Sequence, residues 1–555
     1  MRPHTAVIRR RRARFAAVVL AGSVATLLIA GVLAARQAPP DIAAEGIPPF
    51  VLNDFGGVSR ATLETNALPY KLVATALLIL EERARHTQLG RADIPSIYRQ
   101  FGFVYPRRLG NWPAAVTEPR FDRPVGMIGH VVSGPLPIVK IDAVTLGCAT
   151  CHAGLVYGAD GRVTDTAWVG LPNTSINLEE YTQATYQALK LAVAEGGAFR
   201  GRVRDVFPEL STTERITLRY FLMPRVAKRL REYAADGDAP LPYSNGGAGR
   251  TNGVASLKHM IGVAPGSISG HADVGFTSIP DLSSRALRSS LLYDGVYAPT
   301  GAPRFEPRSV AQSADAHVSA LAEIVAFFTV STMGVVPDVG ERAIQEITPV
   351  VSWIATRYAS PPFPGPIDET RARAGETLFV NRCARCHGTY GEGAPRRLVS
   401  FPNRLVPGSE IGTDSSRWAM IDTTVTSALA ATAYARHMTF ARTGGYVAPI
   451  LSGLWASAPY LHNGSVPTLW QLLTPDERPT QFYVGGHALD FHDMGIAGAR
   501  DADGVYRYDA SYVPWSTPEL YDTRKPGLSN QGHERQVAAL TDAQKRALIA
   551  YLKTL

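Results

Sequence analysis

Helical periodicity is the strongest pattern of hydrophobic and polar residues in this chain. Between residues 71 and 328, apolar residues recur every three or four positions in four stretches, which predicts amphipathic helices. These stretches are Lys71–Arg85, Leu178–Ala194, Ser211–Ala235 and Ala316–Phe328. Strand patterns are few and short, so the sequence predicts a mostly α fold with long loops.

Two further helices are predicted near the end of the chain. Asp368 to Arg382 begins just past a proline-rich stretch, and Thr541 to Leu555 opens with Thr541 and Gln544 at the spacing of a capping box. Gly375 lacks a side chain and would therefore let these two helices cross closely.

The N-terminal sequence predicts a membrane segment. Residues 1–14 contain six arginines and no acid, and residues 15–35 form an apolar run without charge. About 20 apolar residues span a bilayer core, and the preceding positive charge holds the N-terminus in the cytoplasm. We therefore expect a single-pass transmembrane anchor, with a cleaved signal peptide as the alternative. The remaining chain then lies on the periplasmic side of the inner membrane, or is soluble in the periplasm or secreted.

The distribution of charge excludes nucleic acid as a partner. The net charge is +8, and removing the six arginines of residues 1–14 leaves 8 − 6 = +2 on the other 541 residues. Nucleic-acid binders concentrate basic charge on the folded domain, which this chain does not do.

Composition shifts divide the chain into predicted parts. After the basic N-terminus (1–14) and the apolar segment (15–35), we expect a linker, a first lobe, a proline-rich linker and a second lobe. These parts are residues 36–50, 51–355, 356–366 and 367–555.

The four cysteines carry the most specific chemistry. They form two C-x-x-C pairs, Cys148 with Cys151 and Cys383 with Cys386, and a histidine follows each pair directly. A thioredoxin-like dithiol needs a βαβ context that neither site has, and a zinc ribbon places its two pairs about 15–20 residues apart. In C-x-x-C-H, two thiols attach one haem and the histidine binds its iron. The sequence therefore predicts two covalent c-type haems, with His152 and His387 as proximal ligands.

The sixth iron ligands are predicted less directly. His533 lies in Gly532-His533-Glu534, in a loop before the terminal helix, and is the expected second ligand of the haem at His387. Met420 and Met438 are the alternatives. For the first haem no ligand stands out among four first-lobe histidines, His130, His259, His271 and His317. If none binds, the iron has an open face for dioxygen or peroxide.

Several stretches resemble a known superfamily. Pro459-Tyr460-Leu461-His462-Asn463-Gly464-Ser465-Val466-Pro467-Thr468-Leu469 resembles a segment of the di-haem cytochrome c peroxidase and MauG superfamily. With residues 470–479 and 482–485 it looks more like the rubber oxygenase branch, in which a late histidine also binds the second haem. The first lobe resembles this branch in shorter stretches, at 123–127, 170–174 and 280–295.

This resemblance implies two haem lobes and further site residues. His462 corresponds to a histidine near a haem propionate, although an Asn463-Gly464 turn explains it equally well. Tyr293 lies where rubber oxygenases have a tryptophan between the haems, so it either relays an electron or packs. A calcium ion between the lobes is also implied. Four arginines near the second motif either neutralise propionates or form a solvated rim: Arg382, Arg385, Arg396 and Arg397.

Two functions follow from these features. The first is an oxidoreductase in which the first haem, with His152, reacts with peroxide or dioxygen while the second haem relays electrons. The second is a pure electron-transfer module with two six-coordinate haems, which passes electrons from a quinol-side donor to a redox partner protein. The resemblance slightly favours the oxidoreductase, and nothing in the sequence points to a gas sensor.

Overall fold

The structure is a computed structural model. It describes residues 41–59, 62, 67–133, 139–235, 237–263, 273–283, 285–310, 315–332 and 337–555. The predicted basic N-terminus and membrane segment, residues 1–35, lie outside the described residues. Among the residues that are described, no helix combines the length and the apolar character needed to cross a membrane.

The fold is mixed, so the prediction of a mostly α protein was wrong. Helix makes up 41% and strand 17% of the structure. The strands are short, and their burial does not alternate strictly. In β4 (Lys140–Leu146), for example, the consecutive residues Ala143, Val144 and Thr145 are all buried. Strands that bury both faces lack the period of two by which a sequence pattern reveals them.

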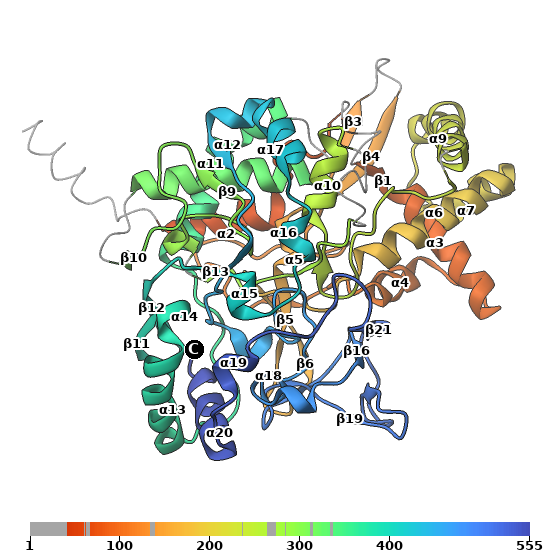
Figure 1. Cartoon of the computed structure of the whole chain (residues 1–555). Coiled ribbons are helices and arrows are strands. Elements are labelled where there is room, and N and C mark those ends of the chain that lie inside the picture. Colours follow the sequence, from red (N-terminus) through yellow and green to blue (C-terminus); the bar gives the residue numbers. More distant parts are fainter. Residues whose placement is uncertain are drawn as a thin grey trace, which may run out of the picture. The chain divides into compact units, whose positions relative to one another are not determined.

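The elements follow one another along the chain as drawn in Figure 1. The helices are α2 (Ile42–Leu52), α3 (Tyr70–Arg85), α4 (Ile94–Gln100), α5 (Cys148–Cys151), α6 (Leu178–Glu195), α7 (Gly197–Val206), α8 (Thr212–Thr217), α9 (Met223–Ala235), α10 (Gly253–Met260), α11 (Asp315–Thr332), α12 (Pro337–Thr356), α13 (Glu369–Arg382), α14 (Ala384–His387), α15 (Gly408–Ile411), α16 (Ser416–Ala419), α17 (Thr423–Ala430), α18 (Leu469–Leu473), α19 (Glu534–Val537) and α20 (Asp542–Leu552). The strands are β1 (Leu68–Pro69), β2 (Arg108–Leu109), β3 (Met127–Ser133), β4 (Lys140–Leu146), β5 (Ala153–Tyr157), β6 (Val163–Val169), β7 (Arg250–Thr251), β8 (Thr277–Ser278), β9 (Tyr297–Pro299), β10 (Arg308–Ser309), β11 (Thr389–Gly393), β12 (Arg396–Phe401), β13 (Leu405–Pro407), β14 (Met438–Phe440), β15 (Gly445–Val447), β16 (Gln481–Val484), β17 (Leu489–Asp490), β18 (Gly495–Ile496), β19 (Ala499–Arg500), β20 (Tyr506–Arg507) and β21 (Glu519–Asp522).

The predicted helices of the first lobe are confirmed, with one interruption. Helices α3, α6 and α11 match the predicted ranges closely. The predicted helix at 211–235 is instead three segments, because the π-helical turn η2 (Leu218–Leu222) separates α8 from α9. The capping box at its start forms as the sequence indicates, with Ser211 accepting from the Glu214 N–H.

The two late helices are also confirmed and cross where predicted. Asp368 caps α13, and Thr541 and Gln544 form the capping box of α20. The two helices lie side by side (Figure 1), and a Cβ at Gly375 would be 1.9 Å from the Ala547 carbonyl oxygen. Glycine is therefore required for this approach, which fixes the helix that leads into Cys383.

Strands rather than long helices surround the first cysteine pair. β4 pairs antiparallel with β3 and β1, and β6 pairs antiparallel with β5 and parallel with β2. The short helix α5 contains both cysteines and connects β4 to β5. The first C-x-x-C-H motif therefore lies at the junction of two small sheets.

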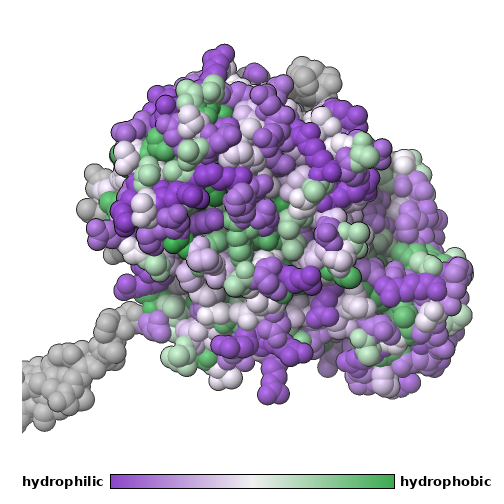
Figure 2. Space-filling model, turned by 90° about the horizontal axis from the view of Figure 1, so that it is seen from below, coloured by the Kyte–Doolittle hydropathy of each residue, from purple (hydrophilic) through white to green (hydrophobic). Residues whose placement is uncertain are grey.

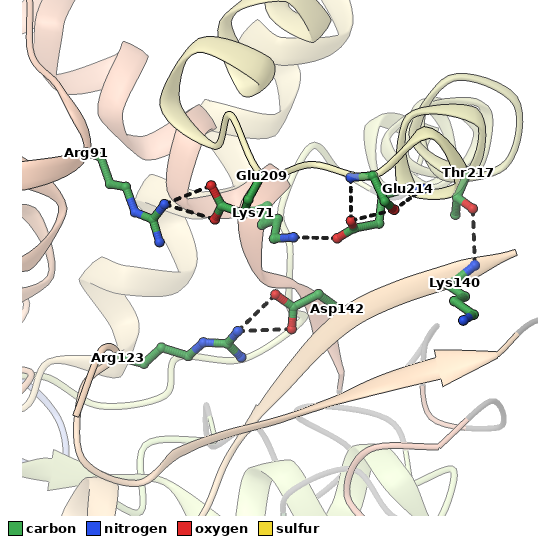
Figure 3. Close-up of polar contacts among 9 residues, drawn as sticks. Lys71, Arg91, Arg123, Lys140, Asp142, Glu209, Glu214 and Thr217 are labelled. Atoms are coloured by element: carbon green, nitrogen blue, oxygen red, sulfur yellow. Dashed lines mark hydrogen bonds and ion pairs between the residues drawn. The ribbon is translucent and has the colours of Figure 1, made fainter. Parts of the chain in front are cut away.

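Polar contacts attach the helical layer to this junction (Figure 3). Arg123 holds the Asp142 carboxylate of β4 at 2.9 and 3.0 Å, and the Lys140 N–H donates to Thr217 Oγ1 at 3.2 Å. Lys71 of α3 pairs with the capping residue Glu214. Two of these contacts hold the first half of β4, at Lys140 and Asp142, and β4 leads directly into the first motif.

Two large clusters of buried hydrophobic residues lie in the described part of the chain. One gathers α3, α4, α6 and α7 around rings such as Tyr98 and Phe199. The other lies beneath the second motif and includes Tyr157 and Leu171 from the first half beside Trp455 and Tyr521. Residues from both predicted lobes thus share one core. The residue boundaries of the two lobes stay a prediction. On the face shown in Figure 2, hydrophilic residues predominate and hydrophobic ones lie in small groups between them.

Candidate haem centres

The second motif presents a histidine with a fixed ring. Helix α13 ends at Arg382, Cys383 caps it, and α14 carries the rest of the motif. His387 Nδ1 lies 2.8 Å from the Pro449 carbonyl oxygen, so Nδ1 carries the proton and donates it. In this tautomer the lone pair of Nε2 is free to bind a metal. Iron-binding histidines are commonly oriented in this way by a hydrogen bond on the other ring nitrogen.

His533 faces His387 at a distance that fits a shared metal. The two ring centroids are 6.2 Å apart and the ring planes differ by 21°. With a metal–nitrogen bond of about 2.0 Å and a centroid about 1.1 Å beyond the nitrogen, two imidazoles on one metal have centroids about 6.2 Å apart. The residues at this site therefore fit an iron with two imidazole ligands.

Burial keeps both rings neutral. It lowers the pKa of His387, against the hydrogen bond to Pro449, and burial, His387 and Arg478 together lower the pKa of His533 to about 3. Only the neutral imidazole binds a metal, so the environment favours the ligating form.

Arg478 holds the loop that presents His533. Its side chain is 4% exposed, and its guanidinium donates to the carbonyl oxygens of Asn530 and Gly532 at 2.7 and 2.9 Å. It also binds the Glu534 carboxylate at 2.6 Å. Its remaining bonds reach the carbonyls of Gln471 and Leu472 in α18. Arg478 thereby connects the ligand loop to a helix of the core, a role that the sequence pattern did not reveal.

An aromatic group includes two predicted site residues. His462 is buried, its ring is 4.1 Å from that of Tyr446, and Tyr293 lies 6.5 Å away. Trp418 continues the row at 4.7 Å from Tyr446. Burial and the charge of Arg417 lower the pKa of His462 to about 3. The structure thus brings His462 and Tyr293 together.

A loop after the first motif fastens Cys148–His152 in place. The N–H of Gly170 donates to the His152 carbonyl at 2.7 Å, and the N–H of Asn173 donates to the Cys151 carbonyl at 2.8 Å. Gly170 in turn accepts from the N–H of Leu282 at 3.1 Å, so the 280–288 segment is attached beside the motif. Burial and the charge of Arg285 lower the pKa of His152 to about 3, against a contact with the Pro280 carbonyl.

The first-lobe histidines do not form a second such pair among the described residues. His130 is about half exposed on β3, with Nε2 3.6 Å from the Asp54 carboxylate. His259 packs against Tyr243. His317 is buried on α11, and His271 lies outside the described residues. None of the ring contacts found in the described part of the chain joins His152 to another histidine, so the sixth ligand of the first haem stays open.

The arginines near the second motif mostly line the surface. Arg382, Arg385 and Arg397 are exposed, whereas Arg396 binds Glu376 of α13 at 2.7 Å. Met420 and Met438, the alternative ligands, are both buried. Met420 directly follows α16, and Met438 is the first residue of β14. Sequence reasoning missed two other arginines: Arg285, whose charge acts on His152, and the buried Arg288, whose guanidinium lies 5.9 Å from the centre of the Phe401 ring.

Other metal sites were also considered. Within the ranges that the structure describes, no three His, Cys, Asp or Glu side chains are arranged to hold a metal ion. The two cysteine pairs therefore do not form one zinc site, and no disulfide joins any of the four cysteines. The calcium ion implied by the resemblance stays a prediction.

Comparison with known proteins agrees with the second site. Residues 445–483 match a family model described as RoxA-like, cytochrome c-like. This segment contains Tyr446, Pro449, His462 and Arg478, and therefore the groups that orient His387 and His533. No match to a peroxidase or MauG family accompanies it.

Two curated relatives are uncharacterized proteins of Sinorhizobium fredii (strain NBRC 101917 / NGR234). The protein y4iM is 32% identical over 233 residues, which are 35% of this chain and 50% of that protein. The protein y4iJ is 31% identical over 252 residues, or 34% of this chain and 40% of that protein. The chain thus spans half or less of the length of these relatives.

The class of protein follows from the motif, the site and the family model. Residues 445–483 thus correspond to part of a cytochrome c-like domain, a class of domain that carries covalent c-type haem.

Proposed function

We propose that this protein is a di-haem c-type cytochrome in which the second haem, between His387 and His533, relays electrons. The single observation that supports this most strongly is the 6.2 Å separation of the two facing imidazoles. Two imidazole ligands leave no coordination position for a substrate and give a lower potential than a Met/His pair. Such a site transfers electrons rather than binding small molecules.

The residues around this site suit electron transfer. Haem iron supplies the one-electron chemistry, and the chain holds its ligands rigid. The Pro449 carbonyl fixes one ring and Arg478 fixes the loop of the other. Rigid ligands need little rearrangement when the charge of the site changes, and this pre-organisation favours fast transfer.

A second candidate function concerns the first haem, at Cys148, Cys151 and His152. The match to a RoxA-like model favours oxidoreductase chemistry with dioxygen or peroxide at this haem. Tyr293 and His462 lie against β15, because the Val447 N–H donates to the Tyr293 carbonyl oxygen and the rings of His462 and Tyr446 are 4.1 Å apart. This strand ends two residues before Pro449. These aromatic rings supply a route for electrons between the two sites. Location outside the cytoplasm, a redox partner protein and a quinol-side donor remain predictions from the sequence.

Carbon monoxide binding separates the two candidates. We would load the full chain with haem and record CO-difference spectra of the fully reduced and the half-reduced protein. CO binding to one haem per chain in either state supports dioxygen or peroxide chemistry at the first haem. No CO binding in both states supports pure electron transfer through two closed haems. CO binding to two haems per chain would contradict the proposed relay role of His387 and His533.

A further inference from the structure

Arg404 lies directly against the second haem-attachment motif. Its Nη1 donates to the Cys386 sulfur at 3.8 Å, and its Nη2 donates to both carboxylate oxygens of Glu410 at 2.8 Å. A cysteine that is joined to haem becomes a thioether, whose sulfur remains a weak acceptor. The contact between Arg404 and Cys386 is therefore compatible with an attached haem. It places a permanent positive charge beside one of the two sulfurs that would hold the porphyrin.

The backbone around Arg404 is fixed on both sides. Asn403 is fully buried, and its side chain donates to the carbonyl oxygens of Leu287 and Glu306, both at 2.6 Å. The side-chain oxygen of Asn403 accepts from the Ser289 N–H at 3.1 Å. Strand β13 begins directly after Arg404 and pairs with β15. The arginine side chain therefore starts from a defined point beside the motif.

The acidic partner of Arg404 belongs to the short helix that holds the His533 loop. Glu410 lies in α15, and the carbonyl oxygen of the next residue, Ile411, accepts from the His533 N–H at 3.2 Å. The Glu410 carbonyl oxygen accepts from the Gln536 side chain at 3.4 Å. The ion pair with Arg404 therefore connects α15, and through it the loop of the distal histidine, to the motif.

Arg404 also adjoins the group that orients His387. Its carbonyl oxygen accepts from the Ala448 N–H at 3.4 Å, and the carbonyl oxygen of the following residue, Pro449, lies 2.8 Å from His387 Nδ1. Arg404 and Glu410 thus lie between the elements that present the two predicted ligands of the second iron. No sequence signal marked this pair, because its members are distant from His533 in the chain.

The electric field at the Cys386 sulfur is positive, because the two charges of the pair are not equally close to it. The guanidinium contacts the sulfur directly, whereas the carboxylate contacts the guanidinium. The side chains of Arg404 and Glu410 are 36% and 34% exposed, so solvent screens both charges in part. An ion pair at this exposure stabilises a fold only weakly. Its position on the haem-binding sulfur is what distinguishes it from the other surface pairs.

We propose that Arg404 raises the reduction potential of the second haem, while Glu410 holds the guanidinium on the Cys386 sulfur and offsets part of its charge. Reduction converts ferric to ferrous iron by one electron and breaks no bond, so it adds one negative charge. A positive charge nearby favours the reduced form, and a negative charge favours the oxidised form. This inference rests on the proposed relay function of the haem between His387 and His533.

The test is a spectroelectrochemical titration of the haem-loaded full chain. Arg404→Gln removes the positive charge and leaves Glu410, so the ferrous-to-ferric ratio of the second haem at fixed potential should fall about threefold. Glu410→Gln removes the negative charge and keeps an amide oxygen as an acceptor for Arg404, so the same ratio should rise about threefold. For one electron, a threefold change corresponds to about 28 mV.

The opposite directions separate a charge effect from a structural one. Both single variants break the same ion pair, so a purely structural role would move the potential in one direction in both. The double variant Arg404→Gln/Glu410→Gln loses one charge of each sign and should return close to the wild type. Arg404→Lys keeps the charge and should move the ratio less than Arg404→Gln does. Glu410→Gln and Arg404→Lys still test the sign if Arg404→Gln does not fold.

Arg507→Gln is the matched control. Arg507 also pairs with a carboxylate at partial exposure, and it belongs to the β19–β20 pair, which lies apart from α14 (Figure 1). Its loss should leave the potential of the second haem unchanged. His533→Ala shows which of the two potentials belongs to the second haem, because this variant changes the ligands of that haem.

Two outcomes distinguish failure of this inference from failure of the relay function. Shifts in the same direction in Arg404→Gln and Glu410→Gln, or no shift in either, would overturn the role of Arg404 and leave the relay function intact. A His533→Ala protein with the spectrum and both potentials of the wild type would instead contradict the relay function itself.

Discussion

The first C-x-x-C-H motif lies between two small sheets, whereas the second lies at the end of a long helix packed against another. The second scaffold places a histidine opposite its motif, with the ring of His533 6.2 Å from that of His387. The first scaffold places the charge of Arg285 near His152 and, in the described part of the chain, no opposing imidazole. The same motif thus fixes where haem attaches, while the surrounding fold decides what faces the iron.

The largest expected effect comes from removing the ligand that distinguishes the two sites. His533→Ala should open the second haem, convert its ferric form to high spin and add one CO per chain in the reduced protein. His492→Ala is the matched control, because this histidine is 75% exposed. Electron paramagnetic resonance and CO titration measure both effects. An unchanged low-spin signal in His533→Ala would mean that another residue binds this iron.

A smaller effect on the second haem is expected when His533 remains and Arg478, which holds its loop, is replaced. Arg478→Gln deletes bonds to Asn530, Gly532 and Glu534. Leaving these acceptors unpaired should cost about 2–4 kcal/mol and partly release His533. We expect a mixture of low-spin and high-spin second haem and a lower urea midpoint. Arg524→Gln, which alters an exposed arginine, should change neither the spin state nor the urea midpoint. A fully low-spin Arg478→Gln protein would show that the loop keeps its conformation without Arg478.

The buried contact between His487 and Tyr157 should make the stability of the protein depend on pH. His487 is fully buried, packs against Tyr157 and has its pKa lowered by burial from 6.5 to about 4. The unfolded chain takes up the proton near pH 6.5 and the folded chain only near pH 4, so stability falls as pH decreases through this window. The loss due to His487 alone is about 3 kcal/mol.

Urea unfolding at a series of pH values measures this loss. His487→Gln should remove this contribution and make the stability profile shallower between pH 6.5 and 4, whereas His492→Gln, which alters an exposed side chain, should not. A wild-type profile that is flat in this window would contradict the buried neutral state of His487.

The smallest effect tests the helical scaffold of the second site alone. Gly375→Ala places a methyl group 1.9 Å from the Ala547 carbonyl oxygen, so α13 and α20 must move apart. Overpacking of this kind costs about 1–3 kcal/mol. Gly201→Ala in α7 is the control, because its nearest neighbour is 3.8 Å away and alanine favours a helix. Equal stability of the two variants in urea would show that the crossing is not tight.

The sequence predicted the second site better than the first for a physical reason. Helices α13 and α20 follow a clear period and carry recognisable caps, so their positions and the place of His533 could be inferred. The sheets around Cys148 contain strands of two to seven residues that bury consecutive positions, and such strands leave no alternating pattern. The fold was therefore expected to be mostly α and is mixed.

Individual functional side chains were missed for another reason. Arginines are usually exposed, so nothing in the sequence marks Arg478 or Arg288 as buried. Their environment depends on residues distant in the chain, such as Gly532 for Arg478. By contrast, Arg382 and Arg385 adjoin the second motif in sequence and lie at the surface. Proximity in sequence is a weak guide to which arginine approaches a cofactor.

The central claim is that His387 and His533 bind one iron within a di-haem chain. The most direct measurement is a haem count per chain by the pyridine haemochrome method, combined with near-infrared magnetic circular dichroism of the ferric protein. The account predicts two haems per chain, one of them with the charge-transfer band of two imidazole ligands. A single haem, or a second haem with the band of a methionine ligand, would contradict it.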